Sequence, residues 1–158
     1  MPGFIHLLLA ITCLALGAMV FMQRKGSKRH RLLGHLYSIS LLLVNISALF
    51  VYEDSVGAGP FHVLALISLA TLSAGFIPAF LRKPANWTSL HAYFMSWSYV
   101  GLVAAGVAQI ATELLTLPTT ITVGLPSLIV IGIGGLMIHT RLPSILAKLT
   151  NHIATPNI

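Results

Sequence analysis

The sequence predicts an all-α membrane protein: a four-helix transmembrane bundle with a fifth, peripheral transmembrane helix. Apolar residues make up 56% of the 158 residues and charged residues only 8%. The mean hydropathy of +0.91 lies outside the usage of soluble proteins. Five apolar runs reach the roughly 20 residues that a helix needs to cross the hydrocarbon layer. We expect one transmembrane domain over residues 1–158, with helices at about 3–23, 32–52, 60–81, 87–111 and 120–140.

Local signals support the individual helices. Residues 1–6 contain no Lys or Arg, and the basic cluster follows the first apolar run, which is the opposite of a cleavable signal peptide. We therefore expect the first run to remain as a helix. Pro60 opens the third helix, where its missing N–H costs nothing. The fifth run is the least regular, because it contains Pro126 and the glycines within 132–135, which we expect to allow close helix contact.

The charges are separated along the chain in a way that predicts orientation. All nine Lys and Arg residues fall in the segments 24–31, 82–83 and 141–148, whereas the three acids lie at 53–54 and 113. Five crossings place every basic residue on one side, which the positive-inside rule makes cytoplasmic. We expect a multi-pass protein of the bacterial inner membrane, with its amino terminus outside and its carboxyl terminus inside. The net charge of +6 then reflects topology and anionic lipid, and no nucleic-acid partner is expected.

The expected membrane interior contains no ionisable acid or base of the kind that carriers use. No Asp, Glu, Lys or Arg lies near the middle of any expected helix. Proton- and ion-coupled carriers usually keep such groups there. This composition argues against a secondary transporter.

The histidines recur at two depths. His6 and His62 lie near the outer ends of the first and third helices, and His30, His35 and His91 near the inner ends of the second and fourth. A single imidazole at a membrane end can simply sit among headgroups. A neutral imidazole is also a good ligand for iron, zinc or copper. Two facing histidines at each depth would make two stacked metal sites.

Small residues accompany the histidines. Ala10, Cys13 and Gly17 follow His6 along one face of the first helix, at spacings of four, three and four. Gly34 and Tyr37 follow His30 on the second helix. Small residues beside a ligand leave space for a flat group such as a porphyrin, but they also let helices approach closely. Both interpretations stay open at the level of sequence.

Two segments carry a resemblance to known proteins. The segment His30–Tyr37, HRLLGHLY, with His6 before it and the segment His91–Tyr99, HAYFMSWSY, after it, resembles a family of small bacterial membrane proteins of unassigned function. The recurrent features are the early histidine, an HR-x2-G-x2-Y motif, and a histidine followed four residues later by methionine. The likeness covers roughly residues 3–110. More distantly, the arrangement is similar to the cytochrome b561 and ferric-reductase class, in which histidine pairs on alternate helices hold two b haems.

This resemblance implies ligands for two haem b groups. His6 with His62 would hold the outer haem, and His30 with His91 the inner one. His35 is the alternative inner ligand, because it lies about 140° around the helix from His30 and only one of them can face the fourth helix. The residues implied at the haems are therefore His6, His62, His30, His91, Gly34 and Tyr37, with His35 and Met95 as further candidate ligands.

Three functions are compatible with these patterns. The first is a di-haem cytochrome, a membrane oxidoreductase that transfers electrons, with a quinol, an ascorbate-like reductant or ferric iron as candidate partners. The second is a haem-free copper or zinc protein that uses His6 and His62 with Glu53 or Asp54. The third is a non-catalytic integral subunit or assembly factor. The small residues Gly101, Ala105 and Ala108 would allow pairing into a homo-oligomer.

Overall fold

The computed structural model describes residues 2–50 and 60–154, with side chains described for 3–50 and 61–147. Within these residues it contains five α-helices and no strand. All five are long and apolar enough to cross a membrane, so the prediction of an all-helical protein with several spans is confirmed. The helices are α1 Pro2–Met22, α2 Lys28–Leu49, α3 Pro60–Leu81, α4 Trp87–Leu114 and α5 Thr119–Ala154.

The second helix begins earlier than its apolar run, at Lys28 rather than at residue 32. Ser27 has extended backbone angles, and its hydroxyl oxygen accepts a hydrogen bond of 3.1 Å from the backbone N–H of His30. This N-cap satisfies a backbone donor that would otherwise lack a partner in the first helical turn. The basic residues after Ser27 are therefore helical, and His30 belongs to the first turn of α2.

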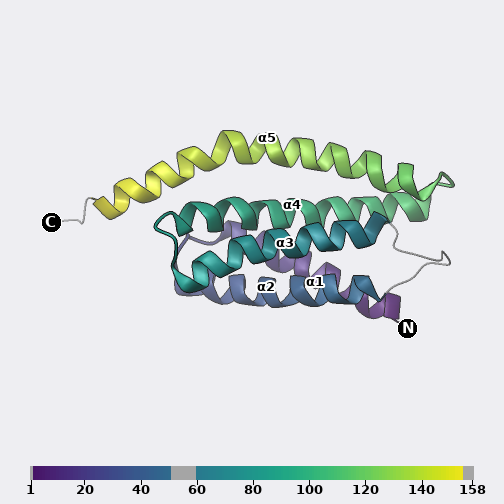
Figure 1. Ribbon diagram of the computed structural model, residues 1–158, viewed down its shortest axis with the longest axis horizontal. Coiled ribbons are helices and arrows are strands. Elements are labelled where there is room, and N and C mark those ends of the chain that lie inside the picture. The colour runs from purple at the N-terminus through teal and green to yellow at the C-terminus, as the bar shows by residue number, and fades with distance from the viewer. Residues whose placement is uncertain (1, 51–59, 155–158) are drawn as a thin grey trace.

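The fifth helix continues well past residue 140, the end expected from hydropathy, and runs to Ala154 through Pro143. Its 36 residues correspond to about 54 Å of helix. Its carboxyl end projects beyond the other helices in Figure 1. The expected and observed ends of α5 differ because hydropathy detects only where the residues are apolar. A helix continues as long as its backbone hydrogen bonds do.

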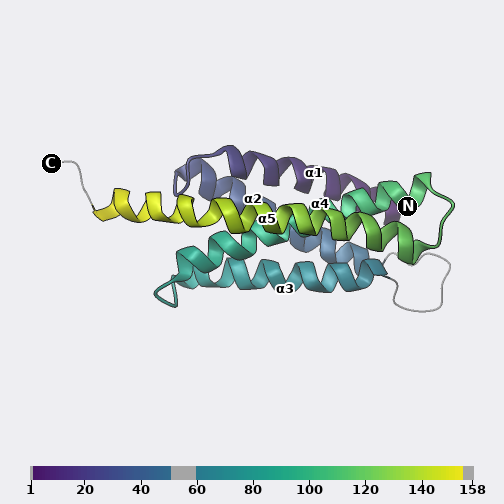
Figure 2. The ribbon, with the colours of Figure 1, turned by 90° about the horizontal axis from the view of Figure 1, so that it is seen from above.

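Four helices surround a common core, and the fifth lies outside α4. α1 packs on α2, α2 on α3 and α3 on α4, while α1 also touches α4. Figure 2 accordingly shows α1 and α3 on opposite sides. α5 runs along α4 and also touches α3. A Cβ atom added at Gly134 would lie 2.6 Å from a Val100 methyl carbon, and one at Gly135 would lie 3.0 Å from the Trp97 ring. The expected role in close helix contact is confirmed for Gly134 and Gly135 and is wrong for Gly132, where an added Cβ atom would meet no neighbour within 4 Å.

The two ends of the molecule differ in charge. The connections 23–27 and 82–86 lie at the same end as the carboxyl end of α5, and the amino end of α1 lies at the other (Figure 1). We call the former the basic end and the latter the opposite end. The connections at the basic end and the helix ends beside them carry Arg24, Lys25, Lys28, Arg29, Arg31, Arg82 and Lys83.

The core of the molecule is small and mostly apolar, and its outer surface is apolar as well. Six buried residues from α1 to α4 form the central cluster: Cys13, Tyr37, Leu41, Val44, Leu72 and Leu102. Large apolar side chains cover the outside of the helices, among them Phe4 on α1, which is 64% exposed, and Leu128 on α5, which is 69% exposed. A soluble monomer rarely exposes so much contiguous apolar surface, so lipid is the medium that suits it.

Candidate functional site

His91 on α4 is fixed by a backbone carbonyl of α3. Its Nδ1 lies 3.0 Å from the carbonyl oxygen of Gly75. A carbonyl can only accept, so Nδ1 carries the proton and Nε2 is the nitrogen with a lone pair. A Cβ atom at Gly75 would lie 3.0 Å from the backbone nitrogen and side chain of Met95. The glycine therefore allows the close approach of α3 and α4 that orients His91.

His30 on α2 shares this region with His91. Its Nδ1 is buried and has no hydrogen-bond partner within the described residues. The His30 ring is also hydrogen-bonded to the backbone of Val20, near the end of α1. His30 and His91 lie close enough for their charges to interact. The structure thus brings together, near the basic end, the two histidines that the resemblance assigns to the inner haem.

Lys25 completes this cluster, and sequence reasoning assigned it only a topological role. Its ammonium donates to the carbonyl oxygens of Val20 and Phe21, each at 3.3 Å, and lies 5.1 Å from the centroid of the Phe21 ring. Burial lowers the pKa of the Lys25 ammonium. Lys25 also interacts electrostatically with His30 and His91. The sequence feature that could have indicated this position of Lys25 is the glycine after it. Gly26 has a positive φ of 78°, which allows the chain to turn there.

His35 lies in a different environment. Its Nδ1 is 2.6 Å from the carbonyl oxygen of Arg31 in the preceding turn, and its ring meets Phe76 of α3 edge-on at 5.9 Å. The side chain is exposed. Its contacts are thus with its own helix and with α3, whereas His30 interacts with His91 on α4.

At the opposite end, the structure holds His6 against α2. His6 Nδ1 lies 2.8 Å from the hydroxyl oxygen of Ser47, which itself donates to the carbonyl oxygen of Val44. The Ser47 proton is thereby used, so His6 Nδ1 is the donor and Nε2 keeps its lone pair. His62 lies half-buried near the start of α3. Within the described residues the backbones of α1 and α3 do not come close to each other, so His6 and His62 lie on helices that are separated across the bundle.

The small-residue stripe of α1 serves close packing in this structure. A Cβ atom at Gly17 would clash with the Tyr99 ring and lie 3.0 Å from that of Tyr37. Cys13 is fully buried in the same core. Gly34 differs, because a Cβ atom there would have no neighbour within 4 Å. Of the two small-residue regions, only that around Gly34 is open.

Tyr37 and Met95 lie farther from the basic end than His30 and His91, on the same two helices. The Tyr37 hydroxyl is 3.0 Å from Ser98 Oγ, and Ser98 Oγ donates to the carbonyl oxygen of Met95. Tyr37 is only 2% exposed. Met95 is partly buried, packs on the central cluster and lies against Gly75. Both residues therefore have packing roles in this structure.

The alternative of a copper or zinc site involves residues that fall partly outside the structure. Glu53 and Asp54 are outside the described residues. Within residues 2–50 and 60–154, no three His, Cys, Asp or Glu side chains group closely enough to hold a metal ion. The histidine sites of the described part consist of pairs at most.

Five apolar helices with buried polar contacts and an apolar exterior define a multi-pass α-helical membrane protein. The chain belongs to the DUF2306 family, described as a predicted membrane protein, whose model matches residues 3–147. No curated protein and no solved structure shows significant similarity to it. The family description gives the membrane location and names no activity.

Proposed function

We propose that this protein is a b-type cytochrome that moves electrons across the bacterial inner membrane. The observation that carries the proposal is the pair His30 and His91 at the basic end. His30 presents a buried ring nitrogen without a hydrogen-bond partner in the described part of the chain. A buried polar atom without a partner is costly unless something else binds it. An iron ion between two imidazoles would satisfy it.

The hydrogen bond of His91 is the kind that supports a metal ligand. Histidines that bind metal usually donate their other N–H to a carbonyl or carboxylate, which fixes the ring and raises its basicity. Gly75 supplies this carbonyl for His91. Gly34, with open space around it, lies on the same helix as His30 and suits a bulky planar group. These features fit a haem at the inner level, with His30 and His91 as its axial ligands.

A second haem at the opposite end is proposed on a narrower basis. His6 donates through Nδ1 to Ser47, so its Nε2 is oriented as a ligand in the same manner as that of His91. His62 of the opposite helix α3 is the proposed partner. Bound haem would accept and release single electrons. The protein residues would hold the two groups at different depths and exclude water from them.

The orientation belongs to the same proposal. The basic end is proposed to face the cytoplasm, because positive residues concentrate on that side of bacterial membrane proteins. The four helices α1 to α4 form the bundle that holds the haems, and α5 is the peripheral helix beside it. The pair His30 and His91 is then the cytoplasmic site, and His6 and His62 lie toward the outside.

An optical spectrum of the purified protein tests the proposal. Protein expressed with ample haem should show a Soret band and a dithionite-reduced spectrum of the b type. His30→Ala and His91→Ala should each lower the haem content, whereas His139→Ala, at an exposed histidine of α5, should leave it unchanged. Protein without a Soret band would overturn the proposal. Loss of haem in His35→Ala but not in His30→Ala would move the ligand to the alternative histidine.

A non-catalytic integral subunit is the second candidate. It is favoured by the hydrogen bonds that His6, His35 and His91 make within the protein, since these give each ring a structural role. It predicts a folded protein without haem, copper or zinc. Elemental analysis beside the spectrum separates the candidates: iron accompanies the cytochrome, copper or zinc without iron the metal-protein alternative, and no metal the structural subunit.

A further inference from the structure

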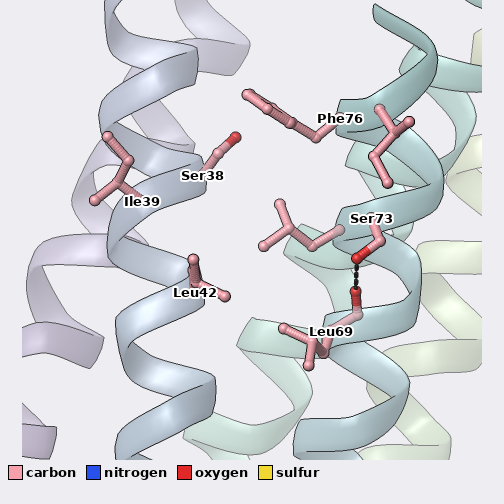
Figure 3. Close-up of a pocket in the computed structure, with 8 residues that line it drawn as sticks. Ser38, Ile39, Leu42, Leu69, Ser73 and Phe76 are labelled. Atoms are coloured by element: carbon pink, nitrogen blue, oxygen red, sulfur yellow. Dashed lines mark hydrogen bonds between the residues drawn. The ribbon is translucent and has the colours of Figure 1, made fainter. Parts of the chain in front are cut away.

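A groove runs between α2 and α3, from the middle of α2 to the middle and second half of α3. Figure 3 shows Phe76 and Ser38 pointing toward each other at one end of it, with Leu42 and Leu69 at the other. Its volume is about 180 Å³. Ile39, Leu42 and Ile77 on its walls are exposed, so it opens to the surroundings of the helices. Because both helices are membrane spans, those surroundings are lipid.

The groove offers no free hydrogen-bond donor to a polar ligand. Its two hydroxyl groups are already used within their own helices. Ser38 Oγ donates to the carbonyl oxygen of Gly34, and Ser73 Oγ to that of Leu69, each at 2.8 Å. The remaining lining is aliphatic or aromatic. A hydrocarbon chain suits such a surface, because it needs no hydrogen-bond partner.

Polarity rises along the groove toward the basic end. Arg31, His35, Ser38 and Leu42 follow one another on one face of α2 at spacings of four, three and four. The stripe thus passes from a cation through an imidazole and a hydroxyl to an apolar side chain. His35 contacts Phe76 of α3, which places this face against α3. A phospholipid has the same sequence of properties, from its phosphate through its ester groups to its acyl chain.

The two connections at the basic end carry basic side chains without acidic ones. The connections 23–27 and 82–86 and the helix ends beside them contain several Lys and Arg residues but no Asp or Glu. Arg31 is exposed at this end, one turn from His35. Basic pockets between transmembrane helices on the cytoplasmic side of a membrane, the side proposed for this end, bind anionic headgroups. The charge of the site therefore selects a negatively charged lipid.

From these observations we propose that the α2–α3 groove binds one anionic phospholipid, with an acyl chain along Leu42, Ser73 and Phe76 and the phosphate at Arg31. The lipid would fill the space between two helices that pack less closely to each other than α3 packs to α4. This proposal does not depend on His30 and His91 as haem ligands, because it uses a different face of α2 from that of His30.

Native mass spectrometry of the full-length protein in mild detergent tests the proposal with two lipids, phosphatidylglycerol and phosphatidylcholine. The wild-type protein should retain one phosphatidylglycerol in preference to phosphatidylcholine. Arg31→Gln should weaken retention about fivefold, the effect of one basic residue near a lipid phosphate. Ser73→Phe and Ile77→Trp, which fill the groove from two positions, should each lower retention of the lipid.

Matched controls separate the groove from general effects. Arg29→Gln removes an exposed charge on the same helix about 200° around from Arg31. Thr12→Phe enlarges an exposed residue of α1 whose hydroxyl, like that of Ser73, donates to the carbonyl four residues before it. Both should retain phosphatidylglycerol as the wild type does. Circular dichroism and thermal unfolding verify that each variant is folded.

The outcomes that overturn the proposal are equally defined. Equal retention of phosphatidylcholine would remove the role of the phosphate charge. Unchanged retention in folded Ser73→Phe and Ile77→Trp would show that the chain lies elsewhere. An equal loss in Arg29→Gln and Arg31→Gln would indicate diffuse attraction to the whole basic end.

Discussion

The Tyr37 hydroxyl donates a hydrogen bond of 3.0 Å to Ser98 Oγ, across the centre of the bundle from α2 to α4. The direction follows from Ser98, whose own proton goes to the carbonyl oxygen of Met95 at 2.9 Å. Both side chains are buried. This bond ties together two helices that otherwise lie on opposite sides of the core.

The first prediction concerns this bond. Ser98→Ala leaves the buried Tyr37 hydroxyl without its acceptor, which should lower the free energy of unfolding by about 1–3 kcal/mol. Tyr37→Phe removes the donor and leaves Ser98 bonded to Met95, so it should cost only about 0.5–1.5 kcal/mol. Thermal unfolding in detergent measures both. Ser96→Ala is the control, because Ser96 donates only to Ala92 of its own helix. A larger loss in Tyr37→Phe than in Ser98→Ala would contradict the assigned direction.

The second prediction compares two glycines. Gly75→Ala places a Cβ atom 3.0 Å from the backbone nitrogen of Met95, so α3 must move away from α4. Overpacking of this kind typically costs about 1–3 kcal/mol. Gly34→Ala meets no neighbour within 4 Å and should raise stability by about 0.5–1 kcal/mol, because alanine favours the helix. Thermal unfolding distinguishes them.

The haem content of the same two variants gives a second measurement. If a porphyrin lies beside Gly34, Gly34→Ala should bind less haem although the protein itself is no less stable. Gly75→Ala should lose haem and stability together, since Gly75 also orients His91. Full haem content in Gly34→Ala would place the porphyrin away from that glycine.

The third prediction concerns Lys25 and rests on the proposed inner haem. Its ammonium is held by the Val20 and Phe21 carbonyls near His30 and His91. A fixed positive charge disfavours ferric iron, which carries one more positive charge than ferrous iron. Lys25→Met should therefore lower the midpoint potential of the inner haem, by on the order of tens of millivolts. Redox titration of the optical spectrum measures the shift.

Lys28→Met is the control for this effect. It removes the same charge from an exposed position at the same end, where solvent screens it. Its potential should remain close to that of the wild type. Equal shifts in the two variants would show that the total charge of the basic end acts, rather than the fixed position of Lys25.

The fourth prediction tests the orientation. Cys13 is the only cysteine and is buried, so a Cys13→Ala background allows single cysteines to be introduced. Glu113→Cys, near the end of α4, should react with a membrane-impermeant maleimide in intact cells. Lys83→Cys, at the basic end, should react only after the cells are opened. The reverse pattern would invert the proposed topology and exchange the sides of the two histidine pairs.

Much of the fold can be predicted from the sequence, because the positions of apolar runs and of charged residues along the chain indicate the spans and their order. The length of each apolar run indicates a span, and the alternation of basic and acidic connections indicates which ends lie together. The same sequence could not show whether the small residues Cys13 and Gly17 leave space for a cofactor or allow helices to pack closely, because that depends on which side chains lie against them. In the structure the rings of Tyr37 and Tyr99 lie against Gly17. The extent of α5 was also missed, since its last turns are helical without being a continuous apolar run.

The sequence by itself determined the five spans, the separation of charge between the two ends and the depth of each histidine. Only the tertiary structure decided how the helices are rotated against one another. That rotation leaves His30 close enough to His91 for their charges to interact and sets the His35 ring edge-on to Phe76. The physical reason is that depth depends on position along a helix, whereas hydrogen bonds and ring contacts depend on which helix stands opposite and at what angle.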